Sequence, residues 1–482
     1  MAAMGPRNLI VAAACLAALA ACAVKPPPVP EEVRKDALQG TEVRATWAKA
    51  DAARADAPSA AISDNWLTTF NDPQLTALVN EAIARNPDLR AAGARVEQAA
   101  AYARSAQAQL LPWLNLLGTG GIKAGGGSDL SSALSGVMLG VSWEPDLWGR
   151  LRYGRNAADD NYASAQADFQ FARQSLAAQV ARSWFLAIET KLELDAAEAM
   201  ATSARSLVSL AEDRQRVGNG SQRDVALARA GLGTMEDSAR QARLAHEQAV
   251  RSLETILGRY PATELAVAEQ MPAMPGPVPV GMPLNMLERR PDVIAAERRV
   301  AAAFNRVGEA KAAQLPTIRL NASVSALSSE VLQLQDDYSN PSAGAGGTFF
   351  APLYQGGALQ AQVSVRTAEQ KEALARYASQ ALRAIGDVEN ALATSAILAE
   401  RVQLLGQVLA DQERALGFEQ AAFRIGRQDL RAVQQQQVQV QSARMALLRV
   451  QSEQLIQRVN LHLALGGSFA EPMAVVAAAE PK

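Results

Sequence analysis

Two stretches of the chain carry a helical pattern of hydrophobic positions over an unusual length. Residues 150–216 and 358–424 contain no proline, and each is followed by a second helical stretch, at 222–257 and 430–465. Each of the first two would extend roughly 100 Å at 1.5 Å per residue, far beyond an ordinary globular helix. We therefore predict two long helical hairpins.

Apolar side chains in the second hairpin recur in steps of three and four residues, which is the spacing of a coiled-coil seam. Small and polar residues interrupt this seam, so the helices are expected to pack closely around a partly polar interior. A soluble antiparallel coiled coil would show the same pattern. The seam positions are Val402, Leu405, Leu409, Gln412, Leu416, Met445, Leu448, Ser452, Leu455, Val459 and His462.

Between the helical stretches the pattern changes to alternation of apolar and polar residues, which is typical of a strand with two different faces. Strands of about ten residues are long enough to cross a bilayer when tilted. A soluble four-stranded sheet with one polar face is the alternative. The clearest strands are 137–144 and 317–327, their weaker glycine-rich partners are 113–122 and 343–353, the loops are 123–136 and 328–342, and the resulting β-hairpins occupy about 113–147 and 317–353.

Four strands cannot form a closed barrel, and open sheet edges are not tolerated in lipid. If these strands cross a membrane, several chains must share one barrel. Three chains with four strands each would supply twelve.

The chain is built from two related halves. Residues 87–112 and 291–316 align without a gap over 26 positions, of which 11 are identical. A repeat this long indicates two copies of a half-domain rather than a short solenoid unit. We predict repeat 1 at 64–258 and repeat 2 at 284–466, each with a helix, a β-hairpin and two long helices, joined by a proline-rich linker at 259–283.

The N-terminus has the features of an export signal with a lipid attachment site. An apolar stretch, too short for a confident membrane span, ends at Leu-Ala-Ala-Cys, with the cysteine at Cys22. This end is similar to the lipobox of bacterial lipoproteins, so we expect residues 1–21 to be a signal peptide and Cys22 to carry a covalent lipid. An ordinary signal peptide with a stray cysteine is the alternative. We predict a lipidated tether at 22–63, whose proline-rich start favours extended backbone, and a flexible tail at 467–482.

Composition and motifs exclude several classes of protein. A formal net charge of -2 gives no basic face for nucleic acid. The sequence contains no nucleophile elbow, nucleotide-binding loop or dinucleotide fingerprint. His246 and His462 are isolated, without metal-ligand spacing, and His462 is expected to pack in the helix seam. We therefore expect no catalytic residue, no metal, no cofactor other than the lipid on Cys22, and a protein that is not an enzyme.

Three stretches resemble the sequence of a known family. Residues 281–293 read Gly-Met-Pro-Leu-Asn-Met-Leu-Glu-Arg-Arg-Pro-Asp-Val, and Ala-Ala-Glu follows at 295–297. Residues 143–150 and 351–357 resemble the strand-to-helix junctions of the same family. The chain resembles the outer membrane factor (TolC) family, and most closely its NodT-type efflux lipoproteins.

This resemblance implies a mainly α fold with transmembrane β: a trimeric, shared twelve-stranded β-barrel, with four strands per chain, continued by a long α-helical coiled-coil tunnel in the periplasm. It implies a homotrimer that is lipid-anchored in the outer membrane and spans it. A periplasmic adaptor (membrane fusion protein) would join it to an inner-membrane RND-type transporter. The implied function is the passive exit duct of a tripartite efflux system for drugs or other small toxic compounds.

The resemblance also assigns a role to the two turns between the long helices, where the family docks its adaptor through a Val-Gly or Ile-Gly pair. These glycines could instead serve only the backbone at a helix end. The predicted docking residues are Arg216, Val217, Gly218, Ser221, Arg424, Ile425 and Gly426.

The narrow end of the tunnel is expected to depart from the family pattern, in which acidic residues just past the second turn often form a ring. Ala432 and Gln435 stand at those positions, whereas the first copy keeps Asp224. We predict an entrance lined by Asp224, Asp429, Arg431 and Gln435, less attractive to cations than an acidic ring. Alternatively, Arg431 only pairs with an acid such as Asp429 or Asp224.

Other functions remain open at the level of sequence. Ducts for drug efflux, metal efflux and type I protein secretion would all share the architecture, and a periplasmic coiled-coil adaptor lipoprotein would share the helical hairpin. A purely structural coiled-coil lipoprotein would not need the alternating strands. The substrate is not encoded here, because its selection belongs largely to the inner-membrane partner.

Overall fold

The computed structural model describes residues 25–40, 43–44, 46–48, 64–119, 134–329 and 342–469. Within these ranges, no helix combines the length and apolar character needed to span a bilayer. The chain forms two compact units. Unit 1 comprises the described parts of 1–40, 94–167 and 295–379, and unit 2 comprises those of 41–93, 168–294 and 380–482.

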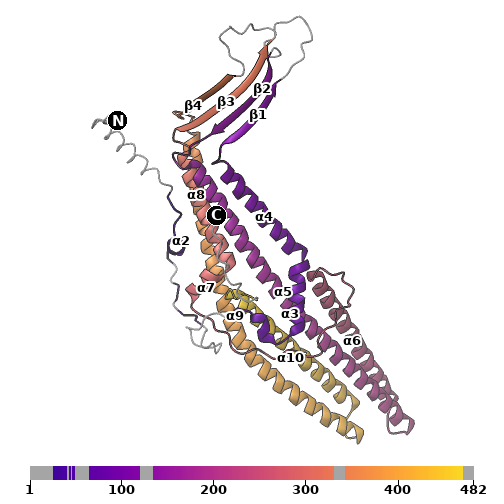
Figure 1. Cartoon of the computed structure of the whole chain (residues 1–482). Coiled ribbons are helices and arrows are strands. Elements are labelled where there is room, and N and C mark those ends of the chain that lie inside the picture. The colour runs from indigo at the N-terminus through magenta and orange to yellow at the C-terminus, as the bar shows by residue number, and fades with distance from the viewer. Residues whose placement is uncertain are drawn as a thin grey trace. The chain divides into compact units, whose positions relative to one another are not determined.

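Unit 1 contains a four-stranded antiparallel sheet in the order β1-β2-β3-β4 (Figure 1). All four predicted strands are present, with ends that differ from the prediction by up to three residues. Pairing of β2 with β3 joins the two hairpins into one sheet. Within the described chain, β1 and β4 each pair on one side only, so the sheet has two open edges. The predicted loops at 123–136 and 328–342 lie largely outside the described residues. The strands are β1 (Trp113–Thr119), β2 (Leu134–Trp143), β3 (Thr317–Ser329) and β4 (Ser342–Phe350).

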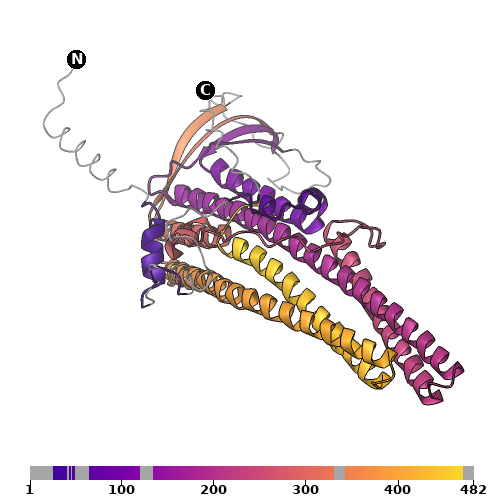
Figure 2. The ribbon, with the colours of Figure 1, turned by 90° about the horizontal axis from the view of Figure 1, so that it is seen from below.

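Six helices occur as three pairs of equal length. The helices α4 and α8 each have 22 residues, α5 and α9 each have 67, and α6 and α10 each have 35. In Figure 2, α5 lies beside α6 and α9 lies beside α10, as the predicted hairpins require. The four long helices begin and end within one residue of the predicted ranges. Their bounds are α4 (Pro87–Ala108), α5 (Arg150–Arg216), α6 (Gln222–Ile256), α8 (Pro291–Ala312), α9 (Ala358–Arg424) and α10 (Leu430–Ala464).

The core of unit 2 forms around the middle of α5. Trp184 and Phe185 are fully buried there against a 3-10 helix, η1 (Trp66–Phe70), and the short helix α3 (Pro73–Arg85). The Trp184 indole donates a hydrogen bond of 2.7 Å to Asp72, which also caps α3. A buried aromatic side chain contributes roughly 1.5–3 kcal/mol by its burial, so this cluster is a main source of stability for unit 2.

His462 of α10 lies in the same region and has the packing role expected for it. Its ring stacks on Trp66 with centroids 5.7 Å apart, and it is buried. Neither ring nitrogen has a hydrogen-bond partner in the described structure. Burial lowers its pKa to about 3, and the nearby charge of Arg458 acts in the same direction. The neutral imidazole is therefore part of the apolar core.

The structure differs from the predicted extended tether. Residues 30–37 form a helix, α2 (Pro30–Ala37), because Pro30 and two glutamates occupy its first turn and basic residues its last. In unit 2, Trp47 is buried and donates hydrogen bonds to the carbonyls of Val280 and Gly281. Parts of segment 22–63 are thus fastened to the folded chain.

The predicted tail also begins later than expected. The Ser468 backbone N–H donates to Asp64, and its carbonyl accepts from Asn65. The Phe469 side chain is buried in the unit 2 core. Residues 467–469 are therefore anchored, and the rest of the predicted tail lies outside the described chain, as do the predicted signal peptide and Cys22.

Candidate functional site

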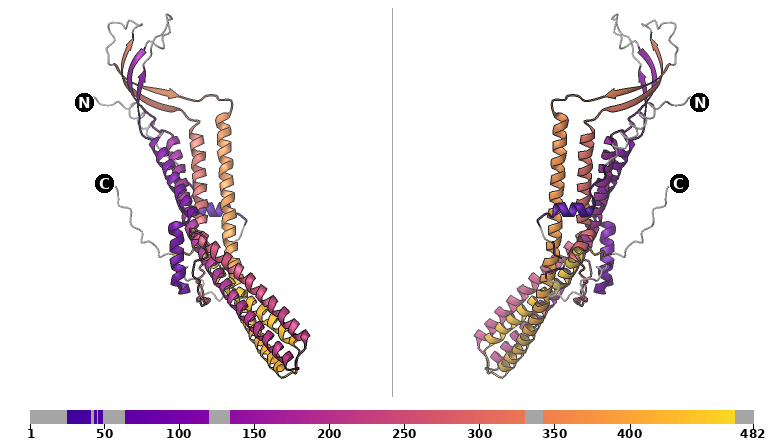
Figure 3. Two further views of the ribbon diagram at one scale, coloured as in Figure 1. Left: turned by 90° about the vertical axis from the view of Figure 1, so that its right-hand side faces the viewer. Right: turned by 90° about the vertical axis from the view of Figure 1, so that its left-hand side faces the viewer.

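The α5–α6 and α9–α10 turns lie at the same end of unit 2 (Figure 3). Gly218 and Gly426 adopt φ of 78° and 76°, a region that other residues rarely adopt, so glycine is required by the backbone at both turns. Beside them, Val217 is 70% exposed and Ile425 is 67% exposed. Each turn thus presents an apolar side chain to solvent on a backbone that glycine permits.

The start of each returning helix is held by a cap. Ser221 Oγ accepts a hydrogen bond of 3.1 Å from the Asp224 backbone, and the Asp224 carboxylate accepts from the Ser221 backbone at 3.0 Å. These two bonds form a reciprocal capping box. The Ser221 hydroxyl also donates to the Asp224 carboxylate at 2.7 Å, and this bond, followed by the bond from the Ser221 backbone, lowers the pKa of Asp224. Asp429 caps α10 by accepting from the Arg431 backbone. Two of the predicted entrance residues therefore have a structural role at helix starts.

Arg431 and Gln435, the other predicted entrance residues, are both exposed. Within the described chain, the Arg431 guanidinium forms no ion pair with Asp429 or Asp224. Arg216 pairs with Asp213 at 3.0 Å, and Arg424 is exposed.

Two glutamines near position 435 link the two hairpins, and a third links the two helices of the second hairpin. Gln434 donates to the Leu227 carbonyl of α6 at 2.8 Å, and Gln437 donates to Ser203 of α5. Gln436 donates to Gln412 of α9. Three of the four consecutive glutamines are thus used between helices, and only Gln435 is left exposed.

Arg214 joins the two turns directly, which sequence reasoning missed. Its guanidinium donates to the Phe423 carbonyl at 2.6 Å and to the Asn219 carbonyl at 3.3 Å. The guanidinium carbon also lies 4.6 Å from the centroid of the Phe423 ring, a cation–π geometry. The position equivalent to Arg214 in the second half is Ala422, so the link has no counterpart. In the sequence, only the presence of an arginine in the last turns of α5 indicates the link made by Arg214.

A buried ionic network surrounds Arg290, between α7 (Pro283–Arg289) and α8. Arg290 is 4% exposed and forms two hydrogen bonds with Asp292, at 3.1 and 2.7 Å. It also donates to Asp387 of α9 at 3.1 Å and to the Ala464 carbonyl of α10. Gln380 of α9 donates to Asp292 at 2.6 Å. The Arg-Pro-Asp part of the recognised motif therefore connects three helices of unit 2.

The sheet of unit 1 has two chemically different faces. On one face Leu116 lies beside Leu139, which lies beside Val324. On the opposite face lie Asn115 and Ser323, both paired with Gly140. This agrees with the predicted alternation. The large side chains exposed on the apolar face are Leu114, Leu116, Val137, Leu139, Val141, Trp143, Leu320, Val324 and Phe349.

Comparison with known proteins identifies the family. The profile of the outer membrane efflux protein family matches residues 78–259 and 283–467. The chain belongs to this family. It is thus an outer membrane channel that acts in efflux and extends into the periplasm, and members of the family are channels rather than enzymes.

Relatives and solved structures cover nearly the whole efflux protein. The pyoverdine export outer membrane protein OpmQ of Pseudomonas putida is 30% identical, over 96% of this chain and 98% of its own. The toluene efflux pump outer membrane protein TtgC of Pseudomonas putida is 28% identical, over 86% of this chain and 87% of its own. The solved outer-membrane channel OprN matches the fold with a TM-score of 0.79 at 26% identity, covering 89% of this chain and 98% of its own.

Proposed function

We propose that this efflux protein is the passive exit duct of a tripartite pump, and that three copies close their sheets into one twelve-stranded barrel. The observation that carries the proposal is the sheet itself: four antiparallel strands, two open edges and one exposed apolar face. A membrane barrel needs about eight or more strands, so one chain does not supply enough.

The exposed apolar face argues against the soluble-sheet alternative. Leu116 is 73% exposed, and its neighbours across the sheet are also large and apolar. A contiguous patch of this kind is rare on a soluble monomer and marks contact with a membrane or a protein. Lipid would cover this face, and the polar face would line an aqueous pore, as in other membrane barrels.

We further infer that the two halves are copies of one unit. The three equal helix pairs support this, as do the two consecutive matches to the family profile. Ser221 and Asp429, which stand 208 positions apart, both cap the helix after a turn. Three copies of such a chain would give a ring of six similar hairpins, with approximate sixfold symmetry.

The two turns are proposed as the docking site for a periplasmic adaptor, which would connect the duct to an RND-type inner-membrane transporter. Val217 and Ile425 would insert into the adaptor, because exposed apolar side chains beside a glycine allow close backbone approach. Near the turns, Arg431 and Gln435 would line the entrance. Energy would come from the transporter, and the duct would need no chemistry of its own.

The lipid anchor at Cys22 is supported by the placement of Lys25. The Lys25 backbone N–H donates to the Tyr153 hydroxyl at 2.9 Å. Tyr153 lies in the first turn of α5, shortly after the end of β2 in sequence. Three residues of extended chain span at most about 10 Å. A lipid on Cys22 would therefore be held near the base of the membrane sheet, where it can enter the inner leaflet.

We propose small organic compounds as the cargo. The relatives are named for pyoverdine export and toluene efflux, and both are small organic molecules. The match with OpmQ covers 98% of that protein, which favours efflux of small molecules over secretion of proteins.

Disulfide trapping tests the shared barrel. Leu116→Cys in β1 and Ala345→Cys in β4 lie on opposite edges of one sheet, roughly 14 Å apart across three strand spacings, too far for a disulfide within one chain. Scanning the cysteine pair along both strands in the outer membrane should yield a covalent trimer without reductant for at least one register. The matched control moves the first cysteine from β1 to the interior strand β2, in the pair Leu139→Cys and Ala345→Cys. This pair should give no cross-linked trimer. If no register gives a cross-link, the shared barrel is wrong.

A further inference from the structure

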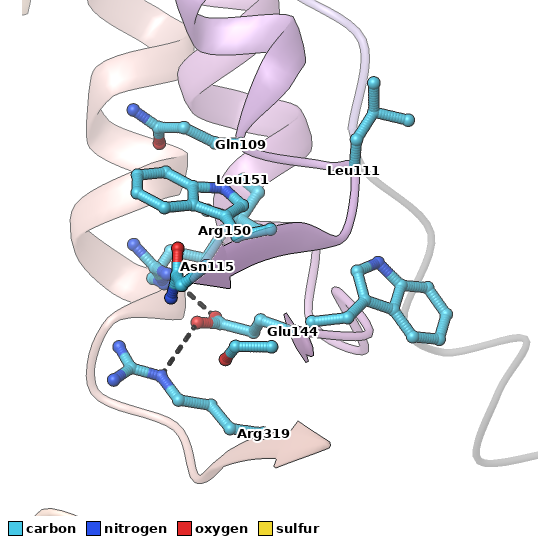
Figure 4. Close-up of a pocket in the computed structure, with 10 residues that line it drawn as sticks. Gln109, Leu111, Asn115, Glu144, Arg150, Leu151 and Arg319 are labelled. Carbon is cyan, nitrogen blue, oxygen red and sulfur yellow. Dashed lines mark hydrogen bonds and ion pairs between the residues drawn. The ribbon is translucent and has the colours of Figure 1, made fainter. Parts of the chain in front are cut away.

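A cavity of about 420 Å³ lies in unit 1 where the sheet meets the helices. Its wall is formed by the segment between α4 and β1, the start of α5 and strands β1, β2 and β3, and Figure 4 shows the residues that line it. The volume is within the range of small-molecule sites. Neither the family resemblance nor the proposed duct assigns it a role.

The strand register places most of the strand residues that line the cavity, although not Trp143, on the polar face of the sheet. Trp113 of β1 pairs with Ser142 of β2, which pairs with Asn321 of β3. Arg319 lies two residues before Asn321 and therefore on the same face. If the apolar face contacts lipid, the cavity opens toward the interior of the duct.

The charges in the cavity leave one guanidinium available. Glu144 is largely buried and accepts a hydrogen bond of 2.7 Å from Arg150. Figure 4 shows Glu144 between Arg150 and Arg319. The Arg319 Nε atom is 3.6 Å from the Glu144 carboxylate, an ion-pair distance that is too long for a hydrogen bond. The Arg319 side chain is 64% exposed, so its guanidinium can also reach an anion in the cavity, and the three groups together carry a net positive charge.

Trp113 supplies an aromatic surface in the same cavity. It is 60% exposed, although it lies on the polar face. In the described chain no other aromatic ring packs against it, and no cation lies over its ring. An indole with an open face can stack a planar ring.

We propose that this cavity is a binding site for amphipathic aromatic anions in the wall of the duct. The anionic group would bind Arg319, whose planar fork matches a carboxylate or phosphate, and the ring would stack on Trp113. Glu144 does not draw a cationic ligand into the cavity instead of an anion, because Arg150 already pairs with it. The assignment to the duct wall rests on the proposed function.

Binding of 1-naphthoate to the purified full-length protein in detergent tests the site. Titration calorimetry should show saturable binding at one site per chain. A hydrogen bond to a charged group is worth about 1.5–3 kcal/mol, so Arg319→Gln should weaken binding about tenfold to a hundredfold. Trp113→Leu should also weaken it, whereas Trp113→Phe should retain most of it. The cation 1-naphthylmethylammonium should not bind this site.

Arg376→Gln is the matched control, because Arg376 is an exposed arginine of α9 that pairs with Glu372 outside the cavity. It should bind 1-naphthoate like the wild type. Equal affinity in wild type and Arg319→Gln, or no saturable binding at all, would overturn the site. Bilayer conductance of the same preparations separates the two proposals: conducting protein without binding sinks the site alone, whereas protein that binds but does not conduct overturns the assignment to a duct wall.

Discussion

Replacing Arg290 with methionine tests whether the buried ionic network is essential to unit 2. Methionine keeps much of the apolar stem of arginine but removes its donors to Asp292, Asp387 and the Ala464 carbonyl. Asp292 would then remain largely buried without its cation. Breaking a buried pair by removing one partner costs about 3–5 kcal/mol, so we expect a loss of that size in the free energy of unfolding.

Guanidinium chloride unfolding followed by circular dichroism measures this loss. Protein concentration is held constant, because the stability of an oligomer depends on it. Arg289→Met is the matched control in the same motif. Arg289 forms a 2.8 Å ion pair with Asp64, but its side chain is 34% exposed, and such pairs contribute at most about 1 kcal/mol.

A double-mutant cycle with Asp292→Asn isolates the charge. Asparagine has nearly the same shape and still accepts from Gln380, but it is neutral, so removing Arg290 no longer leaves a buried charge unpaired. We expect Arg290→Met to cost less in that background, with a coupling of about 0.5–3 kcal/mol. Additive losses, or equal losses for Arg290→Met and Arg289→Met, would show that the buried ion pair of Arg290 and Asp292 is not essential to unit 2.

Three further predictions follow from individual side chains. Val217→Asp or Ile425→Asp should abolish efflux in cells and adaptor binding in pull-down, while bilayer conductance is unchanged; a loss of conductance would point to folding instead. The pKa of His462 is about 3 in the folded protein against 6.5 in the unfolded chain. The free energy of unfolding should therefore fall as pH drops from 6.5 toward 3, by up to about 1.4 kcal/mol per pH unit. In unfolding measured as a function of pH, His462→Leu should flatten that slope. Cys22→Ser should leave no acyl mass on the mature protein by mass spectrometry, and an unchanged acylated mass would disprove the anchor.

The long helices and the strands were predictable because their signals are local. Absence of proline over 67 residues and glycine just past Arg216 and Arg424 define α5 and α9. Alternation over about ten residues defines the strands and their faces. Helix α2 was missed because the neighbouring prolines favour extended backbone, although Pro30 and the charges of its first and last turns indicate a helix.

Contacts between distant segments were not predictable. Arg214 reaches a carbonyl 209 positions away in sequence, and Gln434 reaches one 207 positions away. Nothing local marks such partners, because they depend on how the two hairpins pack. Asp224 is a different case, because it was assigned only to the tunnel entrance although its capping bonds with Ser221 follow a local spacing that indicates such a cap.

The central claim is that three chains form one conducting barrel. Native mass spectrometry of the purified, lipidated protein, combined with planar-bilayer recording of the same sample, tests it most directly. We expect a trimer mass and discrete conductance steps from this sample. A monomer without conductance would contradict it, because four strands with open edges do not make a pore.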